Sequence, residues 1–475
     1  MSVAQEMILM LPEIVLVVGA CFVLLCPRFL AWPLTMLVLA GTVGAIVATA
    51  PEDPTMLMTG MFERSSEIDF LRILICVLTV LILRYARGHP ISPDRLQSNE
   101  FYTLAIFGCV GMFLISGAEH LVTLYLGLEI LALSLYPMIA MVRDDSRAGE
   151  VALKYFVLGA LASGFLLYGM SLMYAATGTL HIGELASQLG QLEMNRVLLL
   201  GMVFMLAGLA FKLGATPFHM WLPDVYDGAS LPAVTYLSAA PKIAGLLLLL
   251  RLFSDGLMAL AVDWTTLMMA LAVLSLLLGN LVAIAQTRIR RMLAYSAIAH
   301  TGFVFLALGV GTPHGMSSAI FYTFVYALMA AGSFGMLLLL NSRVASEDIQ
   351  DFKGLNHSHP WLAIMVLILM FSMAGVPLTA GFYAKLYVLQ AVVDAGLWPL
   401  AVVAVLLTVV GAYYYLRIVW YMYFEEADRP AEPGEDSAHV FLVSANALIL
   451  VFIFAVPQPW LEMSRDVARV FVGGQ

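Results

Sequence analysis

The sequence has 475 residues, of which 62% are hydrophobic and only 12% are charged. Soluble domains carry about 25% charged residues, so this composition excludes a soluble globular protein and indicates an integral membrane protein. The formal net charge of −9 has the wrong sign for a nucleic-acid partner. The four cysteines all fall in apolar segments without a CxxC pattern, so they predict neither a disulfide framework nor a metal site.

Apolar segments long enough to cross a hydrocarbon core of about 30 Å recur along the whole chain. Backbone groups in lipid must be hydrogen-bonded within the protein, and the alternating pattern of a barrel is absent. We therefore expect an all-α integral membrane protein with about fourteen transmembrane helices. The first segment has full spanning length and follows a leader without basic residues, unlike a cleavable signal. The predicted spans lie near residues 7–26, 29–50, 68–87, 101–117, 120–142, 152–176, 196–220, 230–252, 262–286, 291–311, 315–341, 360–394, 397–424 and 438–456.

The basic residues of the connecting loops predict the orientation of the chain. Twelve lie in one set of alternating loops and five in the other, so the first set should face the cytoplasm and both termini the periplasm. The short loop expected at 221–229 contributes no basic residue. The richer set is Arg28, Arg84, Arg87, Arg95, Arg143, Arg147, Arg288, Arg290, Arg291, Arg343, Lys353 and Arg429, and the poorer set is Arg64, Arg196, Arg251, Arg465 and Arg469.

Two groups of five predicted spans form an internal repeat. Because five is odd, the second group must be inverted relative to the first. In both groups the fourth helix combines a lysine with Gly and Pro residues, as FKLGATPF at 211–218 and AGVPLTAGFYAKL at 374–386. Paired interrupted helices in inverted repeats indicate a transport site near the membrane midplane, although Gly and Pro are also common in ordinary membrane helices. The expected divisions are an N-terminal three-helix segment at 1–95, a first repeat at 101–253, a second repeat at 262–424, and a last helix with a short tail at 438–475.

Four of the five lysines fall within predicted spans, where a charge at the helix centre costs about 2.5–3.5 kcal/mol. Lys212, Lys242 and Lys385 are each the only charged residue of a long apolar stretch, and so is Glu129. A chain that retains such charges must neutralise them in ion pairs, employ them in its function, or both. Lys212 and Lys385 could instead snorkel to an interface, although both lie deep. Lys242 could be a structural counter-ion, and Glu129 could be only a neutralising partner.

Other candidates carry stronger competing interpretations. Lys154 follows a glutamate by four residues near a predicted helix start, so an interfacial ion pair competes with a functional role. His300 is the only histidine of its predicted span and is either a satisfied core residue or a proton carrier, because imidazole titrates near neutrality. Tyr322 and Tyr326, one turn apart on the next predicted helix, could order water near His300, although packing is the favoured interpretation. The aromatic run YYYLRIVWYMYF at 413–424 is mostly typical of a membrane-interface belt.

A buried glutamate–lysine pair offers a direct mechanism for proton movement. A carboxylate close to the lysine stabilises its protonated form, and a carboxylate that moves away favours release of the proton. A Gly/Pro break beside the lysine exposes backbone groups to water and lets the helix bend locally. We therefore interpret the lysines of the interrupted helices as proton sites that the breaks hydrate and make movable.

Several motifs together resemble the antiporter-like subunits of respiratory complex I, which are related to Mrp-type cation/proton antiporters. The similarity covers about residues 101–424, and the opening LPEIVLV is also family-like. Among the three bacterial antiporter-like subunits the chain is most similar to the N subunit. It has fourteen predicted spans, a lysine at position 385 where the M subunit would carry a glutamate, and too short a tail for the lateral helix of the L subunit. The motifs are LGATPFHMWLPD, APKIAG, MLAYSAIAHTG and GVPLTAGFYAKL.

This resemblance implies a proton-translocating subunit of NADH:quinone oxidoreductase. No cofactor is expected in this chain, because FMN, iron–sulfur clusters and quinone would belong to partner subunits. The expected partners are the other membrane and peripheral subunits of the complex and the lipid bilayer. The roles implied are a first half-channel formed by Glu129 and Lys212, a hydrated central axis carried by Lys242 and His300, a second half-channel with Lys385 as proton donor, and an auxiliary Lys154.

Two other functions compete with this one. A stand-alone or Mrp-type Na⁺/H⁺ antiporter would also use buried charges, but a sodium site would favour clustered membrane carboxylates, and Glu129 is nearly alone among lysines. A scaffold would carry lysines that only form ion pairs at subunit contacts. The absence of an obvious transit peptide favours a bacterial inner membrane as the location.

Overall fold

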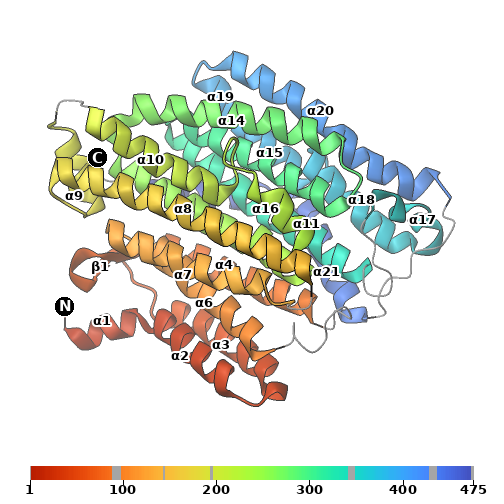
Figure 1. The fold of residues 1–475 in the computed structure, drawn as a ribbon, viewed down its shortest axis with the longest axis horizontal. Coiled ribbons are helices and arrows are strands. Elements are labelled where there is room, and N and C mark those ends of the chain that lie inside the picture. Colours follow the sequence, from red (N-terminus) through yellow and green to blue (C-terminus); the bar gives the residue numbers. More distant parts are fainter. Residues whose placement is uncertain are drawn as a thin grey trace.

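A computed structural model of the chain describes residues 2–87, 98–142, 145–192, 196–340, 348–426 and 436–471. These residues are almost entirely helical, which confirms the predicted helical membrane fold (Figure 1). Four of the arginines used to predict the orientation lie outside the described residues, namely Arg95, Arg143, Arg343 and Arg429.

The N-terminal segment contains helices and one short hairpin. The hairpin strands pair antiparallel, with Thr55 opposite Arg64, and are the only strands in the described part of the chain. Ser2 and Ser65 accept hydrogen bonds from backbone N–H groups at the starts of α1 and α4, which satisfies donors that a helix start leaves free. The elements are α1 (Val3–Leu9), α2 (Leu11–Leu25), α3 (Arg28–Ala48), β1 (Thr55–Leu57), η1 (Met58–Gly60), β2 (Phe62–Arg64) and α4 (Ser66–Ala86).

The region of the predicted first repeat forms helices that pack in pairs, α6 against α7 and α8 against α10. The connection expected at 221–229 lies between two spans, but it contains a short helix, α11, that was not predicted. Trp221 anchors this helix: its indole donates a 2.9 Å hydrogen bond to the Phe211 carbonyl and its ring stacks on Tyr155. The elements are α6 (Asn99–Ser116), α7 (Leu121–Ile139), α8 (Ser146–Thr177), α9 (Ile182–Leu189), α10 (Arg196–Leu213), α11 (Trp221–Gly228), α12 (Leu231–Ser238), α13 (Ala240–Leu249), η2 (Leu250–Gly256) and η3 (Met258–Leu260).

The region of the predicted second repeat and the C-terminal segment are also helical, and α14 packs along α15. The predicted span at 360–394 is divided into two helices, α18 and α19. The elements are α14 (Ala261–Ile284), α15 (Ile289–Gly309), α16 (Pro313–Leu340), η4 (Ile349–Phe352), α17 (Leu355–Ser358), α18 (Pro360–Ala374), α19 (Ala380–Asp394), α20 (Trp398–Phe424), α21 (Ser437–Ala455) and α22 (Gln458–Val470).

Eleven helices in the described ranges are long and apolar enough to cross a membrane, or up to twelve if the bent pair α1–α2 counts as one span. The fold is therefore that of a multi-pass helical membrane protein. The fourteen predicted spans exceed this number because α4, although 21 residues long, carries too many charged residues to be counted and because α18 and α19 are each shorter than a full span.

The most buried helices lie at the centre of the bundle. The apolar stretch of α16 is 100% buried and that of α15 is 94% buried, whereas the stretch of α20 is only 33% buried. Outer helices such as α8, α14 and α20 keep apolar side chains on their outer faces, as a helix in contact with lipid does. Polar side chains on α13, α15 and α16 therefore face neighbouring helices and not lipid.

The two sets of loops separate to opposite ends of the bundle. At one end, Arg84 forms an ion pair of 2.9 Å with Asp436, and Arg288 forms one of 3.0 Å with Asp227. At the other end Arg251 contacts Glu63 in the hairpin. In Figure 1, β1 and α9 lie at the left edge, while α11 and α17 lie towards the right. This separation is the one that the predicted alternation of the loops requires.

A final helix follows the last predicted span, where only a short tail was expected. α22 is amphipathic, with Leu461, Val467 and Ala468 buried and its charged side chains exposed. Trp460 stacks on Phe324 of α16 with ring centroids 5.2 Å apart. The apolar side chains recur at helical spacing, which explains why the tail folds back onto the bundle.

Candidate functional site

Both predicted helix interruptions are present, and each begins at a glycine in the left-handed region. α10 ends at Leu213 and is followed by Gly214 with φ +78°. α18 ends at Ala374 and is followed by Gly375 with φ +82°. A residue with a Cβ adopts such φ values only at an energetic cost, so glycine suits the point where each helix stops. Each interruption leaves the last carbonyl groups of a helix without partners inside that helix.

The lysines of the two interrupted helices do not occupy matching positions. Lys212 lies in the last turn of α10, before the interruption, whereas Lys385 lies on α19, after it. The sequence patterns combine a lysine with Gly and Pro in both cases, but the order differs. The two side chains therefore meet different groups.

Lys212 faces the carboxylate of Glu129, as the sequence analysis expects. Its Nζ lies 3.8 Å from Oε1 of Glu129 on α7. The buried ammonium has no hydrogen-bond partner among the described residues. The hydroxyl of Ser163 on α8 donates a hydrogen bond to Glu129. Since no direct hydrogen bond joins carboxylate and ammonium, a small side-chain movement changes their separation and the strength of the ion pair.

Lys242 reaches the backbone end of the first interrupted helix. Its Nζ donates a 2.8 Å hydrogen bond to the carbonyl oxygen of Leu213, the last residue of α10. The hydroxyl of Thr301 on α15 donates to the same oxygen at 3.2 Å. Lys242 thus stabilises the negative end of the α10 dipole, one residue beyond Lys212.

Lys385 performs the same task at the second interruption. Its Nζ donates 2.9 Å hydrogen bonds to the carbonyl oxygens of Met373 and Ala374, the last residues of α18. It also lies 5.5 Å from the ring centroid of Phe303. Lys242 and Lys385 are therefore the lysines with equivalent contacts, because each binds the carbonyl end of a broken helix.

His300 on α15 lies within a hydrogen-bonded group of hydroxyls. Its Nδ1 is 2.7 Å from the hydroxyl of Tyr322, and its Nε2 is 3.2 Å from that of Tyr415. The Tyr415 hydroxyl also hydrogen-bonds with Ser296. The expectation that Tyr322 only packs is wrong, and the expectation of an interface belt is wrong for Tyr415, because both hydroxyls bind a buried imidazole.

Three small cavities lie between successive members of the series Lys212, Lys242, His300 and Lys385. The first has a volume of about 50 Å³ and is lined by Lys212 and Lys242. The second, of about 20 Å³, is lined by Lys242 and His300. The third, of about 10 Å³, is lined by His300 and Lys385. One water molecule requires about 10–15 Å³, so the cavities are of the size of single or few waters.

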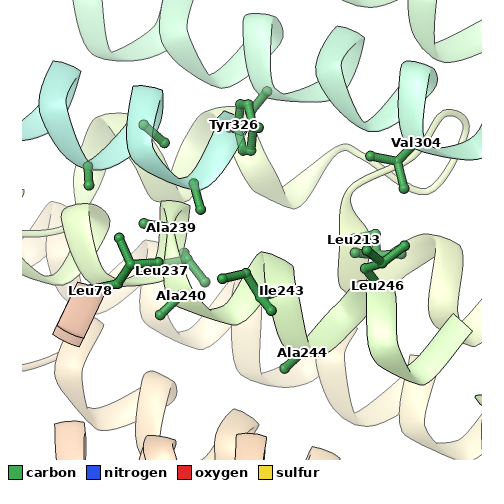
Figure 2. Packing of buried hydrophobic residues seen from close by; sticks show 14 of the residues in the cluster. Leu78, Leu213, Leu237, Ala239, Ala240, Ile243, Ala244, Leu246, Val304 and Tyr326 are labelled. Carbon is green, nitrogen blue, oxygen red and sulfur yellow. The ribbon is translucent and has the colours of Figure 1, made fainter. Parts of the chain in front are cut away.

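The second cavity shows how the interruption brings the two halves of the chain together. Leu213 comes from the end of α10, Leu246 from α13 and Val304 from α15, and all three line it. Figure 2 shows Leu213 and Leu246 close together with Val304 beside them, and Tyr326 of α16 further along. A largely apolar wall leaves the few polar groups as the only partners for water inside the cavity.

Lys154 lies apart from this row. Its Nζ is 2.8 Å from Oε1 of Glu150, one turn earlier on α8, and 3.5 Å from Oδ2 of Asp224 on α11. Its side chain is 47% exposed. The structure therefore places Lys154 in an ion pair at one end of the bundle and not among the buried lysines.

Sequence reasoning missed several partners of the candidate residues. These are the hydroxyls of Ser163, Ser296, Thr301 and Tyr415 and the carbonyl oxygen of Leu213. Serine and threonine are common in membrane helices, and their direction depends on how the helices pack, so no single-sequence signal marks them. Within the described ranges, no three His, Cys, Asp or Glu side chains are grouped so as to hold a metal ion.

The arrangement is suited to passing protons over a distance. Ammonium, imidazole and phenol groups can each donate a proton, and cavities of the size of a water separate them. A charge moving along such a row changes the field at the next ionisable group. We call Lys212, Lys242, His300 and Lys385 the buried row.

Comparison with protein families identifies one matching model, described as "NADH:quinone oxidoreductase/Mrp antiporter, TM", over residues 118–411. Among curated relatives, the NADH-quinone oxidoreductase subunit N of Nitrosomonas europaea is 46% identical over 464 residues. The alignment covers 95% of this chain and 96% of the relative.

Two solved structures share the fold. A chain of respiratory complex I from Thermus thermophilus with bound aureothin is 30% identical, with a TM-score of 0.79 and coverage of 96% of this chain and 98% of that chain. A chain of the Mrp complex from Dietzia sp. is 18% identical, with a TM-score of 0.86 and coverage of 99% and 98%. The second likeness concerns the fold alone.

Proposed function

The chain belongs to the family of NADH-quinone oxidoreductase subunit N, and we propose that it translocates protons through the buried row of Lys212, Lys242, His300 and Lys385. It is an antiporter-like, proton-translocating membrane subunit of complex I. The observation that carries the proposal for the buried row is the succession of three cavities, in which each neighbouring pair of the row lines one cavity.

The residues have distinct proposed roles. Glu129 controls the charge of Lys212 by approaching or leaving it, which is supported by their separation of 3.8 Å without a direct hydrogen bond. Lys242 and His300 carry the proton along the central axis, and Lys385 releases it into the second half-channel. Lys154 is auxiliary: its contact with Asp224 ties α8 to α11, next to the first interruption.

The redox chemistry belongs to partner subunits in this proposal. FMN, iron–sulfur clusters and quinone lie there, and this chain responds to their reaction through the electrostatic field along its buried charges. Its other partners are the remaining membrane and peripheral subunits and the lipid bilayer. We propose no nucleic-acid partner.

We further propose that fourteen segments cross the membrane. To the eleven long apolar helices this adds the bent pair α1–α2, α4, and the broken pair α18–α19. The N-terminal segment at 1–95 precedes two inverted repeats at 101–253 and 262–424, and the last span and tail occupy 438–475. The end of the bundle with Arg84 and Arg288 faces the cytoplasm, and both termini face the periplasm of a bacterial inner membrane, supported by the excess of basic residues.

Purification of the tagged chain from native membranes tests the assignment. We expect it to co-purify with a flavin- and cluster-bearing assembly that reduces quinone with NADH. A chain that purifies alone, or only with other membrane subunits, and that exchanges Na⁺ for H⁺ in liposomes would contradict the proposal and support the Mrp-type antiporter.

A further inference from the structure

A cavity larger than those of the buried row lies away from it. Its volume is about 350 Å³, compared with about 50 Å³ for the first cavity of the row. It lies between the start of α16, α19 and the C-terminal helix α22. It is at the same end of the bundle as Arg251, because Phe471, directly after α22, packs against the Arg251 guanidinium. None of the roles proposed above uses this cavity.

Most of the side chains that line the cavity carry a hydrogen-bond donor, and no carboxylate is among its lining residues in the described part of the chain. Arg465 and Arg469 are one turn apart on α22 and both line it, together with His314, Ser317 and Tyr387. Two guanidinium groups on one helix face attract an anion. The start of the 28-residue helix α16, at Pro313, adds its positive dipole end to the same space.

The acidic residues nearby orient some of these donors and leave one arginine available. Asp394 lies 3.1 Å from Nδ1 of His314, and Asp466 lies 2.7 Å from Arg469. Arg465, in contrast, donates only from its Nε, to the Tyr387 hydroxyl at 3.2 Å. Among the described residues no carboxylate lies within ion-pair distance of Arg465, while the Glu462 carboxylate, one turn earlier on α22, interacts with it electrostatically from further away. Its two terminal nitrogens can therefore form the paired hydrogen bonds that arginine gives to a phosphate.

The position of the cavity favours the phosphate of a lipid. α22 directly follows the last apolar span, α21, so it lies at the end of the bundle where lipid headgroups would surround it, while its own apolar face packs on the bundle. Large apolar side chains continue from the cavity along the outside of the bundle. Val393, next to Asp394, is 52% exposed, and Trp398 at the start of α20 is 65% exposed. Acyl chains would lie against these side chains while the headgroup occupies the cavity.

We propose that this cavity binds the phosphate group of an anionic phospholipid, held by Arg465 and Arg469 of α22. The Tyr387 hydroxyl orients Arg465, and His314 faces the phosphate from α16. The site is separate from the residues proposed to translocate protons. A negative result for lipid binding would therefore not affect the proposed function.

The test uses the purified complex in nanodiscs with a photoactivatable lipid. Phosphatidylglycerol and phosphatidylcholine with the same reactive acyl chain are compared, and the label is located on peptides of this chain. We expect phosphatidylglycerol to label the peptides around α22 and the α19–α20 turn about tenfold more than phosphatidylcholine. The double variant R465Q/R469Q should reduce this preference to near equality, and R465K/R469K should retain part of it because the charge remains.

The matched control is R196Q, which alters an exposed arginine at the same end of the bundle that does not line the cavity. It should leave the labelling unchanged. Equal labelling by the two lipids in the unaltered complex, or unchanged labelling in R465Q/R469Q, would overturn the proposal. Loss of the label in excess inorganic phosphate, with radioactive phosphate binding that requires Arg465 and Arg469, would identify free phosphate as the occupant and overturn the lipid assignment.

Discussion

The ammonium group of Lys242 donates a 2.8 Å hydrogen bond to the carbonyl oxygen of Leu213. This contact joins a lysine on α13 to the point where α10 breaks, one residue after Lys212. A cation at this position stabilises a helix end that lacks its own hydrogen bonds. The proton of Lys242 and the geometry of the first interruption are therefore linked, because a neutral amine would bind this carbonyl less strongly.

Replacing Lys242 by Met should loosen the first interruption. The Leu213 carbonyl would lose its charged donor and keep only the Thr301 hydroxyl at 3.2 Å, and hydrogen bonds to charged groups contribute about 1.5–3 kcal/mol. We expect faster hydrogen exchange in the peptide covering 208–220 of the purified complex. Lys154→Met, which removes a half-exposed lysine, is the control and should leave that peptide unchanged. Identical exchange in both variants would show that Lys242 does not hold the break.

Gly375→Ala should disturb the second interruption and displace Lys385. A Cβ at Gly375 would lie 2.8 Å from Cδ of Lys385, and the φ of +82° adds strain. Gly178→Ala separates the two effects, because Gly178 has φ +74° but no atom within 4 Å of the added Cβ. Strain alone costs about 1 kcal/mol. We expect Gly375→Ala to lower coupled turnover more than Gly178→Ala, and equal activity of the two variants would contradict the importance of Lys385 placement.

Ser163→Ala should alter the behaviour of Glu129. The Ser163 hydroxyl donates to the carboxylate that faces Lys212, and hydrogen bonds to charged groups contribute about 1.5–3 kcal/mol. Its loss should strengthen the attraction of Glu129 to Lys212 and slow proton transfer about tenfold. Ser187→Ala, at an exposed serine on α9, is the control. A pH profile of coupled turnover that is the same in Ser163→Ala and the parent would exclude this role.

Glu119, in the loop between α6 and α7, should make the stability of the complex depend on pH. Burial raises the pKa of Glu119 from 4.5 to about 7, against the opposing effect of Arg251, and nearby Glu63 raises it further. Asp255 also contacts Arg251. The folded state thus holds the Glu119 proton more tightly than the unfolded state. This contribution to stability is complete at low pH and is lost as pH rises towards about 7.

Thermal unfolding of the purified complex between about pH 5 and about pH 8 measures this effect. We expect Glu119→Gln to flatten the fall in stability across that range, because glutamine does not titrate. Glu52→Gln, at an exposed glutamate in the loop before β1, should leave the fall unchanged. An unaltered pH dependence in Glu119→Gln would assign the effect to other groups.

The sequence was sufficient to predict the helical membrane fold, the two interruptions and the isolated charges, whereas the pairing of Glu129 with Lys212 was implied by the family resemblance. Charges isolated in apolar stretches carry a large energetic cost, which makes them visible without a structure. The helix at Trp221–Gly228 was missed because Pro223 and two aspartates resemble a loop, while its stability comes from the packing of Trp221 on Tyr155.

The hydrogen-bond partners of the candidate site could not be predicted. Tyr415 belongs to an aromatic run that a membrane interface would equally favour, and only the position of α20 next to α15 brings its hydroxyl to His300. The equivalence of Lys242 and Lys385 was hidden for a similar reason. It depends on which carbonyl each ammonium reaches, and this follows from helix packing and not from the spacing of Gly, Pro and Lys.

Proton pumping by the Lys212→Ala complex tests the central claim most directly. NADH-driven proton uptake and turnover would be measured in inverted membrane vesicles, with Lys154→Ala as the matched control. The account predicts an assembled complex with coupled turnover and pumping reduced about tenfold or more in Lys212→Ala, and much less in Lys154→Ala. Full pumping by an assembled Lys212→Ala complex would contradict it and would favour a scaffold in which the buried lysines only form ion pairs.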